Sequence, residues 1–167
     1  MAKNTRQDSL LLGLYFGDTR NSYFGKCFDL NKQKLIVPGP GNSSVQYRFT
    51  DSLFHKEPTD VRLLFRPTFD KNDKISEMVL EFSYPAWAPW NRQFQSDSLE
   101  QKVVKVLMHW YKGNAFVKAH VNEGELPVKV DGNRRMMVYI KDPESVIVKI
   151  QDIMHPDFMH SISQKKN

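Results

Sequence analysis

The sequence of 167 residues has one cysteine, Cys27, and no long uncharged apolar run. A single cysteine excludes an internal disulfide framework and any zinc site built from several thiolates. The apolar stretch Leu10–Phe16 reaches only about a third of the roughly 20 residues that a membrane-spanning helix needs, so we expect no membrane span. The first four residues lack the apolar core of a secretory signal. This predicts either a cytoplasmic protein or an extracytoplasmic one whose leader has been removed.

Charge of one sign is not concentrated in any part of the chain, although the formal net charge is +5. Residues 1–57 hold 8 basic and 5 acidic side chains, and residues 58–113 and 114–167 each hold 8 and 7. A surface that follows a phosphate backbone usually clusters its Lys and Arg. Nucleic-acid binding is therefore an alternative function and not the leading one.

Residues 60–113 hold the clearest secondary-structure signals. Val61–Phe69 and Ile75–Tyr84 alternate apolar and polar side chains around the turn residues Asp70–Asp73, which predicts an antiparallel hairpin. Ser98–Gln101 has the spacing of a capping box and begins a repeat of apolar side chains every three or four positions. We expect a helix over residues 98–112 that stops at Gly113 and covers one face of the sheet.

Residues before the hairpin give weaker signals. Tyr23–Leu30 carries apolar side chains at helical spacing after Asp18, a candidate cap. Two strands are the alternative, because Gly25 and the aromatic residues disfavour a helix. Residues 37–44 are rich in Pro and Gly and predict a connecting loop. Residues 45–50 predict a short strand, and residues 51–59 a polar connection into the hairpin.

Beyond Gly113 the pattern is that of strands. Residues 115–121 and 146–153 alternate, and residues 128–130 and 136–140 flank Asp131–Asn133, a strong hairpin signal. The prediction is a single α+β domain over residues 9–153, an antiparallel sheet with two helices packed on one face. The order also fits two repeats of α-β-β-β, residues 9–86 and 95–153. Residues 1–8 and 154–167 are expected to be flexible or loosely packed.

The layout of helices and antiparallel strands carries a resemblance. Gly13–Asp18 before the first helix, Asp70–Phe82 as a hairpin and Leu107–Gly113 closing the second helix resemble units of β-lactamase-inhibitor-protein (BLIP-like) domains and of small outer-membrane-assembly lipoproteins. Phe82–Asn91 is similar to segments of uncharacterised bacterial proteins of this kind. The resemblance implies a non-enzymatic protein-binding module, and it assigns no functional residue.

Two surface regions are candidates for binding a partner protein. Trp87 and Trp90 share the loop of residues 84–94 with Pro85 and Pro89, which stiffen it, and the two rings give it a large contact area. The alternative is that both rings close the core where the sheet passes to the helix. The second region is the sheet face that the helices leave uncovered, for which a solvated surface is the alternative. The alternation places on it Arg62, Arg66, Lys118, Arg135, Tyr139 and Lys149.

A basic stripe follows the predicted helix: Lys102, Lys105, His109 and Lys112. It would suit an acidic partner, and the alternative is a solvated helix face with cations near the negative end of the dipole. The sequence has no nucleophile elbow, paired-histidine helix or phosphate loop, and the spacing of His155 and His160 fits no standard zinc site. We expect a non-catalytic macromolecule-binding protein without cofactor or metal. A small hydrolase or metal protein is the further alternative.

Overall fold

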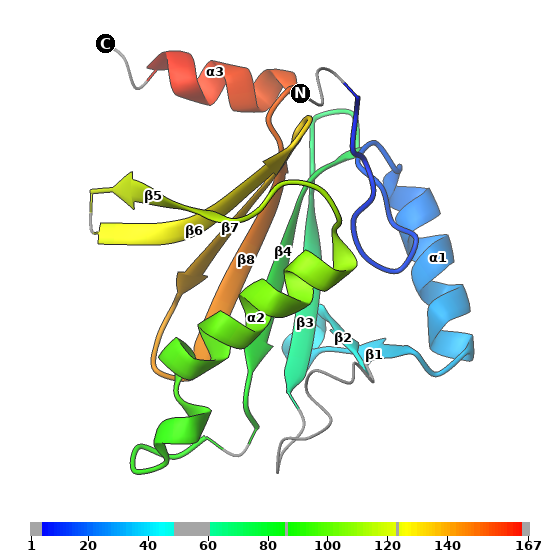
Figure 1. Ribbon diagram of the computed structural model, residues 1–167. Helices are drawn as coiled ribbons and strands as arrows, with labels where there is room; N and C mark the ends of the chain where they lie inside the picture. The colour runs from blue at the N-terminus through cyan, green and yellow to red at the C-terminus, as the bar shows by residue number, and fades with distance from the viewer. Residues whose placement is uncertain (1–4, 49–60, 86, 123, 165–167) are drawn as a thin grey trace.

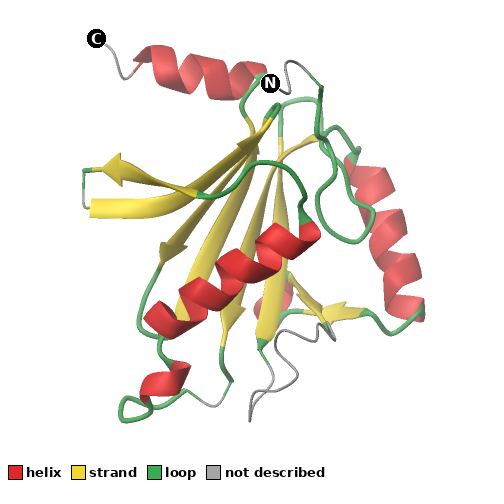
Figure 2. Ribbon diagram, viewed as in Figure 1, coloured by secondary structure: helices red, strands yellow, loops and turns green. Residues whose placement is uncertain are grey.

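The computed structural model describes residues 5–48, 61–85, 87–122 and 124–164, and of these it describes residues 161–164 by backbone alone. An eight-stranded antiparallel sheet is the centre of this part of the chain. The strand order is β1-β2-β3-β4-β8-β7-β6-β5 (Figures 1 and 2). The strands are β1 (Ile36–Pro38), β2 (Val45–Tyr47), β3 (Arg62–Phe69), β4 (Ile75–Ser83), β5 (Val117–Val121), β6 (Gly124–Asp131), β7 (Arg134–Ile140) and β8 (Ser145–Asp152). The predicted α+β class with an antiparallel sheet is confirmed.

The sheet consists of two halves that meet between β4 and β8. The helix α1 (Arg20–Lys32) precedes β1–β4, and α2 (Ser96–Trp110) precedes β5–β8. The halves lie in mirrored strand order, so β1 and β5 are the outer strands. Each half has one strand more than the predicted α-β-β-β unit. In the first half the additional strand is β1. This strand and the 3-10 turn η1 (Pro40–Asn42) lie where a loop was expected. The predicted connection over residues 51–59 lies outside the described residues.

α2 crosses one face of the sheet, which we call the inner face (Figure 1). Its buried apolar side chains are Leu99, Val103, Val106 and Leu107. The side chains that strands β4, β7 and β8 contribute to this core are Met78, Leu80, Phe82, Met136, Val138, Val146, Val148 and Ile150. The helix begins two residues before the predicted capping box, because the chain leaves the turn η2 (Arg92–Phe94) and the Ser96 N–H donates to the Pro143 carbonyl at 3.1 Å.

α1 stands at the β1 edge of the sheet, so only α2 lies across the inner face (Figure 1). The predicted helix is confirmed, but its cap is Thr19 and not Asp18: the Thr19 hydroxyl accepts from the Ser22 N–H at 3.2 Å. Asp18 instead pairs with Lys26 at 2.8 Å. The loop before α1 completes the core with Leu10, Leu11, Leu14 and Phe16.

A third helix, α3 (Pro156–Gln164), lies in the tail that was expected to be loosely packed. Proline at the first helical position costs no hydrogen bond, which favours a helix start here. The helix lies at the end of β8 (Figure 1). There Phe158 packs on the guanidinium of Arg135, with 4.6 Å between the cation and the ring centre. This contact places α3 against the sheet face opposite α2, the outer face.

A buried cluster of charges fixes the β6–β7 turn to the segment after α2. The Lys129 ammonium lies 2.9 Å from the Asp131 carboxylate, and both side chains are almost fully buried. Asp131 also accepts from the Asn114 N–H at 2.8 Å, and Arg134 lies 3.6 Å from Asp131. Gly132 in the turn has φ 58°, a left-handed conformation that glycine adopts without strain.

Candidate functional site

The sheet opens between β6 and β7. The two strands pair from Asp131↔Arg134 to Val128↔Met137 and no further, although β6 extends back to Gly124 and β7 extends on to Ile140. Figure 1 shows β5 and β6 projecting together from the body of the protein. A gap in the hydrogen-bond ladder therefore lies inside the sheet and not at its edge.

Pro127 stands at the point where the ladder stops. The side-chain amide of Asn114 donates to the Val130 carbonyl at 2.6 Å, so the backbone of Val130 faces away from β7. Because backbone groups alternate in direction along an antiparallel strand, Lys129 and Pro127 face β7. Proline has no N–H to donate, so it cannot continue the ladder.

The same alternation fixes what β7 presents to the gap. Lys141 N–H donates to the Ser145 carbonyl at 3.0 Å, and Ile153 N–H to the Asn133 carbonyl at 2.8 Å, so the odd-numbered residues of β7 face β8. The even-numbered residues Val138 and Ile140 face β6. The Val138 carbonyl and both backbone groups of Ile140 therefore point into the gap, with no paired residue of β6 opposite them.

A cleft of about 410 Å³ occupies this gap. Its lining residues are Glu100, Val121, Glu125, Leu126, Tyr139 and Ile140. A continued register would pair Leu126 with Tyr139 and Glu125 with Ile140, so the cleft is the space that the missing ladder would have closed. Its volume falls in the range of roughly 300–1,000 Å³ that ligand sites occupy.

The two sides of the cleft differ in character. Leu126 and Tyr139 belong to the outer face, as does Val121, which lies opposite Gly124. Glu125 and Ile140 belong to the inner face, where Glu100 of α2 joins them. One side is thus apolar, and the other carries two carboxylates.

Partial burial raises the pKa of Glu100, and the charge of Asp97 raises it further, whereas Lys118 lowers it. Glu125 lies 3.9 Å from the Lys118 ammonium and 3.3 Å from the His120 ring. Lys118 is thus close to both carboxylates of the cleft. Its side chain is 80 % exposed, so a different cation can replace it at little cost in burial.

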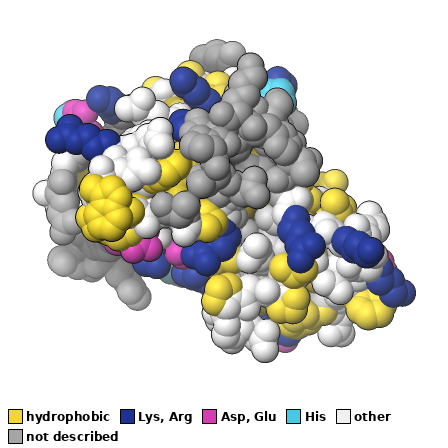
Figure 3. Space-filling view, turned by 90° about the horizontal axis from the view of Figure 1, so that it is seen from below, with side chains coloured by type: hydrophobic (Ala, Val, Ile, Leu, Met, Phe, Trp, Pro, Cys, Tyr) yellow, Lys and Arg dark blue, Asp and Glu magenta, His cyan; other side chains and the backbone are white. Residues whose placement is uncertain are grey.

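The predicted tryptophan loop lies away from the cleft lining. Trp90 is 85 % exposed, so the interpretation of both rings as core is wrong for this residue. Trp87 is half-buried, and its indole N–H donates to the side-chain oxygen Oε1 of Gln95 at 3.4 Å. Figure 3, which views the protein from below, shows hydrophobic side chains exposed on the left.

The residues predicted for the uncovered sheet face lie on it with one exception. Arg62, Arg66, Arg135, Tyr139 and Lys149 are on the outer face. Lys118 is on the inner face, because it lies opposite Pro127, two positions from Lys129. The predicted residues form two separate groups on this face. Arg62 and Arg66 lie on β3, Arg135 and Tyr139 lie on β7, and strands β4 and β8 lie between the two groups.

Acidic residues and α3 occupy part of this outer face. Lys141 lies 3.5 Å from Glu81, and Gln151 joins Arg135 to Glu77 with hydrogen bonds of 2.6 and 2.5 Å. The face therefore holds charges of both signs next to each other and is not a basic surface for a phosphate backbone.

The predicted basic stripe is only partly a free surface. Lys105 and His109 are exposed on α2, and Lys112 is exposed beyond its end. Lys102 is half-buried, and its ammonium donates to the Tyr84 hydroxyl at 3.0 Å. Tethering Lys102 in this way removes it from the set of cations available to a partner.

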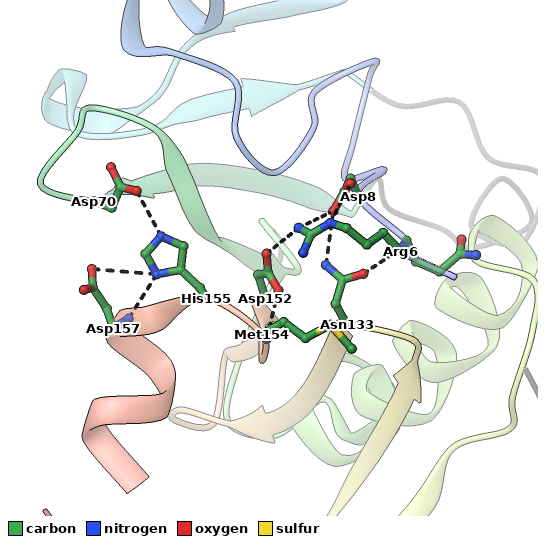
Figure 4. A network of polar contacts seen from close by, with 9 residues as sticks. Arg6, Asp8, Asp70, Asn133, Asp152, Met154, His155 and Asp157 are labelled. Atoms are coloured by element: carbon green, nitrogen blue, oxygen red, sulfur yellow. Dashed lines mark hydrogen bonds and ion pairs between the residues drawn. The ribbon is translucent and has the colours of Figure 1, made fainter. Parts of the chain in front are cut away.

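A second group of polar residues lies where α3 begins, beside a cavity of about 200 Å³ (Figure 4). His155 Nδ1 accepts from the Asp157 N–H at 3.3 Å, so the ring proton is on Nε2, which donates to Asp70 at 2.9 Å. Burial raises the pKa of Asp70, but donors from Lys74, His155 and Asn72 outweigh burial and lower it. Both His155 nitrogens are engaged, so this ring attaches α3 to the β3–β4 turn and has no lone pair for a general base.

Among the described residues, no three His, Cys, Asp or Glu side chains are placed to hold a metal ion, and no described helix has the length and apolarity needed to cross a bilayer. Comparisons with models of protein families, with curated proteins and with solved structures found no match. Of the residues that line the cleft, the sequence prediction included Tyr139 and missed the other five, Glu100, Val121, Glu125, Leu126 and Ile140. The signal that could have found them is Pro127, a proline within an alternating apolar segment next to a hairpin turn.

Proposed function

We propose that the protein binds an extended segment of a partner protein in the β6–β7 cleft, by strand addition. The observation that carries the proposal is the interrupted ladder, since backbone donors and acceptors face the cleft from Glu125 on β6 and Ile140 on β7. An added strand gains main-chain hydrogen bonds from such groups and specificity from pockets for alternate side chains. The BLIP-like resemblance, which stays a prediction, implies the same class of function.

The two sides of the cleft define the sequence of the ligand. Successive side chains of an extended strand point to opposite faces. One set would meet Val121, Leu126 and Tyr139, and the other would meet Glu100 and Glu125. The preferred ligand is therefore a segment that alternates apolar and basic residues.

A peptide titration tests this pattern. The probe is a fluorescein-labelled, end-capped peptide of about six residues, the usual length of a strand, that alternates Val and Lys. Two controls are a peptide that alternates Val and Glu and a peptide of the same Val and Lys content arranged in two blocks. We expect the alternating Val-Lys peptide to bind at least about tenfold more tightly than either control, a difference of about 1.4 kcal/mol.

Two measurements locate the bound peptide. Strand addition predicts slower hydrogen exchange at the Ile140 amide when the Val-Lys peptide is present. Glu125→Lys should abolish binding, whereas Asp29→Lys, an equal change of charge on the exposed surface of α1, should leave it intact. Equal binding of the block peptide, or an unchanged Ile140 amide in the complex, would contradict strand addition.

A further inference from the structure

A second surface, at the opposite edge of the sheet, differs from the cleft in shape and charge. An apolar groove of about 380 Å³ runs between α1 and the β1–β2 hairpin. Phe24 and Phe28, one helical turn apart, form one wall and are 57 % and 62 % exposed. Ile36, Val37 and Pro38 of β1 form the other wall. Two large, adjacent aromatic side chains on the water-facing side of a helix are unusual and indicate a contact surface.

α1 is apolar on two sides for different reasons. Tyr23 is buried in the core and packs edge-on against Phe69, with 5.7 Å between ring centres. Phe24 also touches Tyr23 edge-on, with 5.3 Å between ring centres, but Phe24 and Phe28 both leave more than half of their surface exposed. The core thus explains Tyr23, but it does not explain why the phenylalanine pair is so exposed.

The β1 edge cannot accept an added strand. The carbonyl of Ile36 faces outward and is already bonded to the side-chain amide of Asn31 at 2.9 Å. Pro38 faces the same way and has no N–H. A ligand must therefore be held by side-chain contacts in the groove, the mode by which an amphipathic helix binds.

Basic residues border the groove. The Lys32 ammonium lies 4.4 Å from the centre of the Phe28 ring. Lys34 and Arg48 are exposed beyond it, where the Arg48 N–H donates to the Leu35 carbonyl at 2.9 Å. Among the residues that the structure describes, those lining the groove include no acidic side chain. Figure 3 shows hydrophobic side chains beside Lys and Arg at the right of the protein, the side on which α1 lies in Figure 1.

We infer that the groove between α1 and β1 binds an acidic amphipathic helix of a partner protein. The apolar side chains of that helix would lie against Phe24 and Phe28, and its carboxylates would face Lys32, Lys34 and Arg48. This inference is independent of the β6–β7 cleft, which favours a ligand of opposite charge and extended conformation.

Cys27 provides a direct measure of groove occupancy. It lines the groove and is the only cysteine of the chain, so alkylation by iodoacetamide reports on this one position. Burial raises the pKa of its thiol, although a hydrogen bond with Tyr23 lowers it, so the uncomplexed protein should react slowly. A bound helix would slow the reaction further by covering the groove.

The probe is a helical peptide of about fifteen residues with leucines at helical spacing and glutamates on the flanking positions, and the control peptide has lysines in place of the glutamates. We expect the glutamate peptide alone to protect Cys27. Phe28→Ala should raise its Kd at least about tenfold, as for an aromatic anchor. Tyr15→Ala, which removes an exposed aromatic ring outside the groove lining, should leave the Kd unchanged. Lys32→Glu should weaken binding, and the matched Lys71→Glu in the β3–β4 turn should not.

Three results would overturn the inference. The first is equal protection of Cys27 by the glutamate and lysine peptides. The second is an equal effect of Phe28→Ala and Tyr15→Ala while both variants keep the wild-type melting temperature. The third is Phe28-dependent sedimentation with phosphatidylserine vesicles combined with no binding of the glutamate peptide, which would make the groove a lipid-binding surface.

Discussion

Replacing Pro127 by alanine should close the β6–β7 cleft. Alanine supplies an N–H at the position that faces β7, where the carbonyl of Val138 has no donor from β6. We expect the ladder to extend toward Gly124, which would bring Leu126 opposite Tyr139 and Glu125 opposite Ile140. The cleft residues would then pair with one another and would no longer be available to a peptide.

The magnitudes show which measurement is informative. One additional backbone hydrogen bond stabilises the folded state by about 0.5–1.5 kcal/mol. Loss of proline opposes this by about 0.4–1 kcal/mol, because the unfolded chain gains conformational freedom. The two terms nearly cancel, so the free energy of unfolding should change by less than about 1 kcal/mol. A thermal melt therefore cannot test the argument, but local hydrogen exchange can.

The assay compares amide exchange and peptide affinity in the same protein. In Pro127→Ala the Ile140 amide should exchange more slowly than in wild type, and the alternating Val-Lys peptide should bind more weakly. Pro143→Ala, in the exposed turn before β8, is the matched control, because it has a similar effect on the unfolded chain but does not reach the cleft. Unchanged exchange at Ile140 together with unchanged affinity would refute the role given to Pro127.

Four further outcomes follow from the structure. Lys129→Ala should lower the free energy of unfolding by about 3 kcal/mol, the low end for breaking a buried pair, because Asp131 stays buried and keeps only the more distant Arg134 as its cation. The double variant with Asp131→Asn should recover part of this loss in urea denaturation. The raised pKa of Glu100 means that this carboxylate takes up a proton at a higher pH than an ordinary glutamate, whose pKa is about 4.3. Affinity for the Val-Lys peptide should therefore fall as pH drops through the raised pKa. Glu100→Gln should remove this pH dependence. The lowered pKa of Asp70 means that its charge stabilises the fold above about pH 3.9, and that this contribution is lost as pH falls through the lowered pKa. The urea midpoints of wild type and Asp70→Asn should therefore converge at acid pH. A difference between the two midpoints that stays constant with pH would contradict this. Trp90→Ala should change stability by no more than about 0.5 kcal/mol, whereas Trp87→Ala should cost more; a large loss for Trp90→Ala would mean that its ring is packed in solution.

Local periodicity was sufficient to predict most of the sheet and α2. β3 and β4 alternate because one face of each strand is buried in the core, and the turn residues between them bond their own backbone through Asp70. The sequence favours α1 less clearly, because Gly25 and the aromatic residues are poor helix formers. The helix prediction succeeded through residue spacing, although the capping hydroxyl belongs to Thr19 and not to Asp18.

The cleft could not be predicted from alternation, because it depends on register. In β6 the apolar residues Val128 and Val130 face outward, and Lys129 and Asp131 face the core. This inversion is stable only because Asn114, Lys129 and Arg134 surround the Asp131 carboxylate, a contact between segments that are separate in the sequence. The β6–β7 register also decides that the backbone of Pro127 faces β7. α3 was missed because the contacts that hold it, from His155 to Asp70 and from Phe158 to Arg135, also join segments that are distant in the sequence.

The cleft is a better place for an added strand than either edge of the sheet. The β1 edge is closed by Pro38 and by the Asn31 amide. At the β5 edge, the outward-facing backbone belongs to Lys118 and His120, whose charged or polar side chains disfavour a neighbouring strand. A strand added at β5 would also gain hydrogen bonds on one side only. In the cleft it can bond to both β6 and β7 while its side chains meet Leu126 and Tyr139 on one face and Glu100 on the other. More of the backbone is satisfied there and more apolar area is buried, so binding should be concentrated at the opening that Pro127 creates.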